Sequence, residues 1–341
     1  MPLPIILGIG AFVAGACGVG SGVHGAVKMK EANDTMKAAD SRHQENIDKF
    51  DNESNLTNKS MDALGALELE ILKSFENFSD TIEKIQNRPQ FKEYKQDGVE
   101  LPKYDKEELK NVSVGAGVLL GGLGGAAVGT AGGFAAAGAA TTAVMALGTA
   151  STGTAIASLR GVAATNATLA ALGGGAVAAG GGGIALGTTI LGATTLGIGL
   201  LVGGAIFNAT GGKLSEKADE AWAQMLKAEE TINTACSYLG KLRTASNKYK
   251  KVLTAVREKY MAYFGVVSIA VDILNKHDWN EFSDTEKLAT QNSVLLVGLL
   301  YKMCQVSLVN KAKTENEMNT VNNSEIKKSI DMAENVMGNL A

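Results

Sequence analysis

Apolar side chains between Leu214 and Tyr263 recur at alternating steps of four and three residues, with Lys and Glu on the other faces. This period of 3.5 residues, kept over about seven repeats, predicts a coiled-coil-like helix of about 50 residues, about 75 Å long. Many stripe positions hold Ala, Ser or Tyr, so the pattern indicates helix packing inside a bundle and not an independent zipper. The predicted seam contains the larger aliphatic residues Met225, Ile232, Leu239, Leu242, Leu253 and Val256.

A matching stripe runs through residues 61–85 of the first polar part of the chain, and Glu68 is its one polar member. A weaker stripe over residues 29–43 extends it upstream. Pro89 disfavours helical geometry in the residue before it, so we expect the helix to end there and residues 89–105 to form a loop. Because both stripes must be buried, we expect the two arms to pack against each other.

The tail of the chain predicts two further helices. Ser283 begins a sequence with Glu three residues later, which is the composition of a capping box. The apolar run 294–309 that follows is interrupted by Lys302 and is short for a membrane span, so a buried bundle helix is favoured over a membrane segment. Apolar positions at helical spacing predict a final amphipathic helix over residues 326–340.

The centre of the chain, residues 113–212, holds 28 of the 41 glycines and one charged residue, Arg160. The uncharged runs 114–159 and 161–212 are each too long for one membrane span and suit two helices of about 20 residues. We therefore predict about four membrane-inserting helices. Their high Ala and Gly content makes insertion marginal, and Arg160 is expected at a turn near lipid headgroups.

Glycines recur in this centre at intervals of four residues. On a helix, this spacing produces a groove without side chains, where a second helix can approach closely and gain backbone contacts. Single pairs of this kind are weak evidence, but five in register predict a packing surface. The predicted helix-packing glycines are Gly117, Gly121, Gly125, Gly129 and Gly133, with the separate pairs Gly183–Gly187 and Gly199–Gly203.

The patterns together predict an all-α fold, with long coiled-coil-like arms on either side of the glycine-rich centre. Four parts follow: an apolar glycine-rich segment (1–27), the first arm and loop (28–112), the glycine-rich region (113–212), and the second arm with the C-terminal helices (213–341). Residues 1–27 have no basic start, so an uncleaved membrane-active or packing segment is favoured over a cleaved signal. We expect a membrane-associated protein, with a soluble form also conceivable.

Composition excludes several kinds of chemistry. The net charge is -3, and no basic stretch contains interleaved aromatic residues, so nucleic acid is not an expected partner. The 3 Cys and 3 His lack metal-ligand spacing. Gly212-Lys213 lacks the glycine that a phosphate-binding loop requires, and the carboxylates are scattered over polar faces. The sequence therefore predicts no enzyme, no cofactor and no small-molecule substrate.

The layout of long helix, apolar centre and long helix resembles the α-helical pore-forming toxins of bacteria and the hydrophobic translocators of type III secretion. This resemblance is one of organisation, and no residue motif is shared. The glycine run from Gly117 to Gly133 also resembles the segments of bacterial glycine-zipper membrane proteins.

These observations lead to three functional hypotheses. The first is a self-associating membrane-inserting protein that forms a pore or perturbs a bilayer, with lipid and further copies of the chain as partners. The second is a constitutive membrane scaffold or sensor whose coiled arms bind other proteins. The third is a soluble all-helical bundle.

Overall fold

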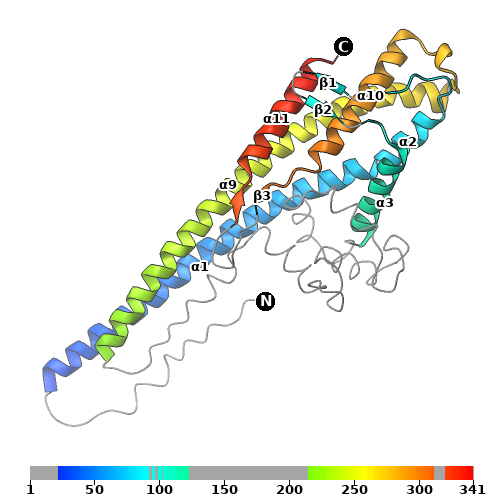
Figure 1. Cartoon of the computed structure of the whole chain (residues 1–341). Coiled ribbons are helices and arrows are strands. Elements are labelled where there is room, and N and C mark those ends of the chain that lie inside the picture. The colour runs from blue at the N-terminus through cyan, green and yellow to red at the C-terminus, as the bar shows by residue number, and fades with distance from the viewer. Residues whose placement is uncertain are drawn as a thin grey trace, which may run out of the picture.

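The computed structural model describes residues 22–91, 94–96, 99–101, 103–122, 214–310 and 319–340. Helices dominate these residues, which confirms the predicted all-α fold. Two long helices form the axis, and four shorter helices pack around one half of it (Figure 1). The long helices are α1 (Gly22–Lys73) and α9 (Leu214–Ser268), and the shorter ones are α2 (Phe75–Glu83), α3 (Lys106–Gly122), α10 (Asp284–Met303) and α11 (Asn323–Gly338).

Helices α1 and α9 run parallel to each other. Arg42 donates to both carboxylate oxygens of Glu229, over 2.7 and 2.9 Å, and further along the pair Arg257 lies 3.6 Å from Glu70. Residue numbers rise together along the two helices, so both begin at the same end of the molecule (Figure 1). The predicted packing of one arm against the other is present, in a parallel arrangement.

One continuous apolar core joins all six helices. Aromatic rings fill it where α2 meets the C-terminal part of α9. The ring of Phe78 makes edge contacts with Tyr260 and Phe264, at centroid distances of 6.0 and 5.5 Å. The second arm is therefore buried by a bundle in this half of the molecule, as its Ala, Ser and Tyr content predicts.

The first arm is interrupted at Ser74, where the sequence predicts an unbroken helix. The Ser74 hydroxyl donates to the carbonyl of Ile71 over 2.6 Å, and the hydroxyl of Ser113 in α3 donates to the carbonyl of Lys73, also over 2.6 Å. Hydroxyl groups that bond to helix carbonyls in this way bend helices. The arm therefore divides into α1 and α2, which ends at Glu83, a few residues before Pro89.

Two short hairpins connect the helices. Strands β1 (Tyr94–Gln96) and β2 (Val99–Leu101) pair antiparallel within the predicted loop 89–105. Strands β3 (Val309–Asn310) and β4 (Thr320–Val321) pair antiparallel before α11. The predicted helix over 294–309 therefore ends early, at Met303, because the chain turns there into β3.

The helix ends follow their capping residues. Ser283 and Glu286 form the complete predicted capping box at the start of α10. At its C-terminal end α9 continues into a π-helical turn (Ile269–Ile273), and Asn275, with φ of 53°, reverses the chain. A 3₁₀ turn (Trp279–Glu281) then leads to α10. Lys84 at the end of α2 binds Asp272 in the π turn over 2.7 Å and so fixes α2 to this end of α9.

The membrane interpretation requires a correction. Among the residues that the structure describes, no helix is both long and apolar enough to cross a membrane. Helices α1 and α9 have charged residues along their outer faces, and the apolar residues of α10 are buried in the bundle. The hypothesis of a membrane-inserting, pore-forming chain with transmembrane helices is therefore wrong, and the alternative of an all-helical bundle fits the described helices better.

Candidate functional site

The six predicted seam residues of α9 all lie in the core. Met225, Ile232, Leu239, Leu242, Leu253 and Val256 are each 0% exposed. Polar contacts support the pairing with α1: the hydroxyl of Thr57 donates to the carbonyl of Leu239 over 3.1 Å, and the hydroxyl of Ser246 donates to the carbonyl of Ser60 over 3.2 Å. The inner face of α9 is thus fully used in packing against the core and α1.

Most of the predicted packing glycines lie outside the described residues. These are Gly125, Gly129, Gly133, Gly183, Gly187, Gly199 and Gly203. Gly117 and Gly121 belong to α3, which crosses the predicted boundary between residues 112 and 113. A Cβ added to Gly117 would meet no atom of the described part of the chain within 4 Å, so no described backbone packs closely against it.

The opposite face of α9 is exposed and divides into two halves of opposite charge. We call this the outer face. Among the side chains that the structure describes from Leu214 to Leu239, the exposed acidic residues are Glu216, Asp219, Glu220 and Glu230, against one exposed base, Lys227. From Gly240 to Ser268 the exposed basic residues are Lys241, Lys248, Lys251 and Lys259, against one exposed acid, Glu258.

Two grooves lie on the outer face. The first, of about 820 Å³, runs along the acidic half past Leu226, Glu230 and Asn233, with β4 at its edge. The second, of about 430 Å³, runs along the basic half past Asn247 and Lys250. Both are open surfaces, of the kind that suits contact with another protein more than enclosure of a small molecule.

The core contains a buried acid, contributed by α1. Glu68 is 0% exposed, and its two carboxylate oxygens have no hydrogen-bond partner among the described residues. The thiol of Cys304 donates to the backbone carbonyl of Glu68 over 3.9 Å, and the nearby Tyr249 hydroxyl bonds to Ser329 and to the carbonyl of Met303. Burial in this apolar core raises the pKa of Glu68 well above its ordinary value, so the fold favours its neutral form.

Sequence reasoning did not assign a role to Glu68, although the signal was present. It is the one polar member of an otherwise apolar stripe, and residues on such a stripe face the core. The same buried cluster includes a thiol whose pKa burial raises, that of Cys304, and burial also raises the pKa of Cys236 in α9. Protonated, buried thiols are poor nucleophiles, so these cysteines are packing residues.

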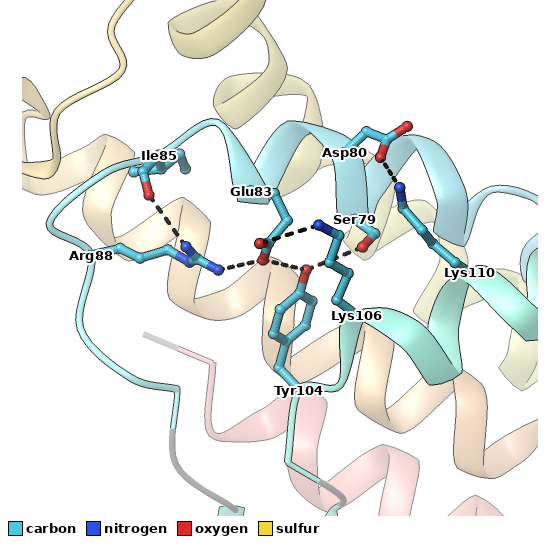
Figure 2. Close-up of polar contacts among 8 residues, drawn as sticks. All are labelled: Ser79, Asp80, Glu83, Ile85, Arg88, Tyr104, Lys106 and Lys110. Atoms are coloured by element: carbon cyan, nitrogen blue, oxygen red, sulfur yellow. Dashed lines mark hydrogen bonds and ion pairs between the residues drawn. The ribbon is translucent and has the colours of Figure 1, made fainter.

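A second polar cluster joins the end of α2 to the start of α3 (Figure 2). The Glu83 carboxylate accepts from Arg88 and from the hydroxyl of Tyr104, the latter over 3.2 Å, and lies 3.7 Å from the ammonium of Lys106. The hydroxyl of Tyr104 also contacts that of Ser79. Burial, followed by the charge of Glu83, raises the pKa of Tyr104 to about 12, so the phenol stays neutral and can donate to the carboxylate.

This cluster positions α3. A second ion pair between the same helices, Lys110 with Asp80 at 2.6 Å, lies one helical turn further along α3 (Figure 2). The cluster itself consists of one carboxylate, Glu83, with two basic partners, Arg88 and Lys106, and the neutral phenol of Tyr104. A carboxylate whose contacts are two bases and a neutral phenol suits a structural link between helices and not proton transfer.

Replacing Glu83 with Ala should loosen α3. The change removes the acceptor shared by Arg88, Tyr104 and Lys106, and because Glu83 is partly exposed we expect a loss of about 1 kcal/mol in the free energy of unfolding. Amide hydrogen exchange should become faster in α3 and remain unchanged in α10. Glu76→Ala, an exposed position on the same helix, is the control; equal exchange in both variants would contradict the role of Glu83.

Metal binding has no support in the described helices. No group of three or more His, Cys, Asp or Glu residues that could hold a metal ion occurs in the part of the chain that the structure describes. Within the described residues, the outer face of α9 and the buried Glu68 are candidates for function. A scan against protein-family models, a search of the curated proteins and a search of the solved structures each gave no match.

Proposed function

We propose that this chain is a non-catalytic structural protein, a helical bundle that acts by associating with other copies of itself. The observation that carries the proposal is the exposed outer face of α9, which extends along a helix of 55 residues whose inner face is fully occupied by the core. A long helix with one buried and one exposed face is a surface on which another helix can pack.

The parallel pair of α1 and α9 supports this proposal by making the surface rigid. Arg42 binds Glu229 through two hydrogen bonds, and its guanidinium also lies over the ring of Trp222, 5.8 Å from the centroid. Further along, Arg243 pairs with Glu53 at 3.0 Å. Bidentate arginine contacts fix geometry as well as adding energy, so α9 presents its outer face in one orientation along the pair.

The polar clusters of the described residues give a second line of support. Glu83 and Arg88 link α2 to the segment before α3, and Tyr249 links α9 to α11 through Ser329. Each cluster joins helices to one another. A protein whose polar groups are used in this way fits a structural role better than a catalytic one.

Sedimentation equilibrium of the full chain tests the proposal. We expect the weight-average mass to rise with concentration from that of a monomer of 35.3 kDa towards that of a dimer. The association should weaken as salt is added, because the outer face is charged. A mass that stays monomeric at every concentration and salt level would contradict the proposal.

A further inference from the structure

Two residues of opposite charge lie at equal distances from Gly240 on the outer face of α9. Glu230 lies ten residues before Gly240, and Lys250 lies ten residues after it. Glu230 lines the first groove and Lys250 lines the second. Groups of opposite charge therefore occupy equivalent positions on either side of Gly240.

Two further pairs of groove residues follow the same relation, whereas Lys241 in the first groove and Glu258 in the second do not. Asn233 in the first groove and Asn247 in the second are equally far from Gly240, and so are Leu226 and Thr254. Acidic and basic, amide and amide, and leucine and threonine methyl group are each compatible pairs in a protein interface. These three pairs make the part of the outer face between Leu226 and Thr254 complementary to itself when its direction is reversed.

Gly240 has the properties required at the centre of such an arrangement. It is partly exposed, and a Cβ at this position would meet no described atom within 4 Å. Ser237 and Thr244, one turn to either side, are exposed and small. A second helix can therefore approach the backbone of α9 at Gly240, with the exposed side chain of Lys241 beside the contact.

We propose that two copies of this chain associate through the outer faces of their α9 helices, antiparallel and with the two Gly240 residues at the crossing point. This inference rests on the proposed self-association and adds to it the face and the direction. An isologous dimer places each residue opposite its symmetric partner, so Glu230 of each copy meets Lys250 of the other. A parallel pair would bring acidic half against acidic half and basic half against basic half, which is unfavourable.

Charge reversal tests the face. Glu230→Lys and Lys250→Glu should each weaken the dimer by about tenfold or more, because a substitution occurs twice in a symmetric dimer and creates two like-charged pairs. The double variant Glu230→Lys/Lys250→Glu restores both pairs of opposite charges. Its dissociation constant should therefore return to within about a few-fold of the parent value. Lys327→Glu, an exposed position on α11, is the control and should leave association unchanged.

Spin labels test the direction. Labels on Gly240→Cys should lie close together in the dimer. Met261 is exposed and lies 21 residues beyond Gly240. In the antiparallel arrangement, labels on Met261→Cys of the two copies are displaced from the crossing point in opposite directions, so they should lie about 63 Å apart at 1.5 Å per residue. In a parallel arrangement, both pairs of labels would be close. The unsubstituted chain, labelled in the same way, gives the background from its native cysteines.

The outcomes separate the two proposals. A dimer that weakens with either reversal, recovers in the double variant and shows a long distance at position 261 supports both proposals. A dimer that is indifferent to the reversals, or that brings the labels at position 261 together, overturns the antiparallel α9 interface and leaves self-association standing. A chain that remains monomeric overturns both. Circular dichroism of each variant confirms that the exposed substitutions leave the helices intact.

Discussion

Leu239→Asp is expected to lower the free energy of unfolding by about 4 kcal/mol, because it places an unpaired charge in the core. Leu239 is 0% exposed, and its backbone carbonyl accepts the hydroxyl of Thr57 from α1. The carboxylate would be buried between the two long helices, where an aliphatic side chain now packs. Urea denaturation followed by far-ultraviolet circular dichroism measures the change.

The control for this prediction is Ala262→Asp, which adds the same charge to the same helix at an exposed position outside both grooves. Surface substitutions of this kind change stability by about 0.5 kcal/mol or less. Equal midpoints for the two variants would show that Leu239 is not packed between α1 and α9. A selective loss in Leu239→Asp would establish the inner face of α9 as the main seam of the fold.

The sequence predicts the long helices well because their apolar stripes are long and regular. The α9 stripe from Ala218 to Tyr260 is buried as its period requires. Direction is a different matter, since an apolar stripe is equally suited to a parallel and an antiparallel neighbour. The parallel arrangement is defined by polar contacts such as Arg42 with Glu229, between residues 187 apart in sequence, and single-helix periodicity carries no record of such pairs.

Breaks and ends depend on groups that have weak local signals. Ser74 divides the first arm through its own hydroxyl and through Ser113, which lies 40 residues away from the carbonyl that it binds. The early end of α10 at Met303 follows from the hairpin of β3 and β4, which are too short to show a pattern. Both features are tertiary effects that override a continuous helical stripe.

The functional surface was only partly predictable. The sequence identified the inner residues of α9. Which charged residues form the outer face depends on their exposure in the folded chain, and one edge of the first groove is supplied by strand β4 of the neighbouring hairpin. The change from acidic to basic residues at Gly240 could have been found by comparing the two halves of the predicted helix. The membrane interpretation rested on the glycine-rich centre, and most of its predicted spans lie outside the described residues. Among the described residues, no helix is both long and apolar enough to cross a membrane.

Glu68→Met is expected to raise the free energy of unfolding at pH 7 by about 2–4 kcal/mol, because replacing a buried ionisable group with an apolar side chain of similar length removes its desolvation cost. Glu68 is fully buried without a hydrogen-bond partner for its carboxylate oxygens among the described residues. Glu70→Met, two residues further along the same helix, is the matched control, since the Glu70 side chain is 57% exposed.

The pH dependence of this difference follows from the direction of the pKa shift. Burial raises the pKa of Glu68 in the folded chain above its ordinary value of 4.5, so the folded chain binds a proton that the unfolded chain releases. Stability therefore falls as the pH rises from the unfolded value through the folded one, and then becomes constant. The gain from Glu68→Met should be largest above the folded pKa and should shrink towards pH 4, where the carboxyl is mostly neutral in both states.

The groups around Glu68 do not obscure this test. Burial raises the pKa of Tyr249 and of Cys304, so both remain neutral between pH 4 and pH 7. Burial lowers the pKa of His43, which destabilises the fold in acid, but it does so equally in the parent and the variant and cancels in their difference. Unfolding midpoints of the two chains at pH 4 and pH 7 measure the effect. A stability difference between variant and parent that is the same at pH 4 and pH 7 would mean that Glu68 is hydrated. A difference confined to pH 7 identifies Glu68 as a buried acid whose ionisation destabilises the fold.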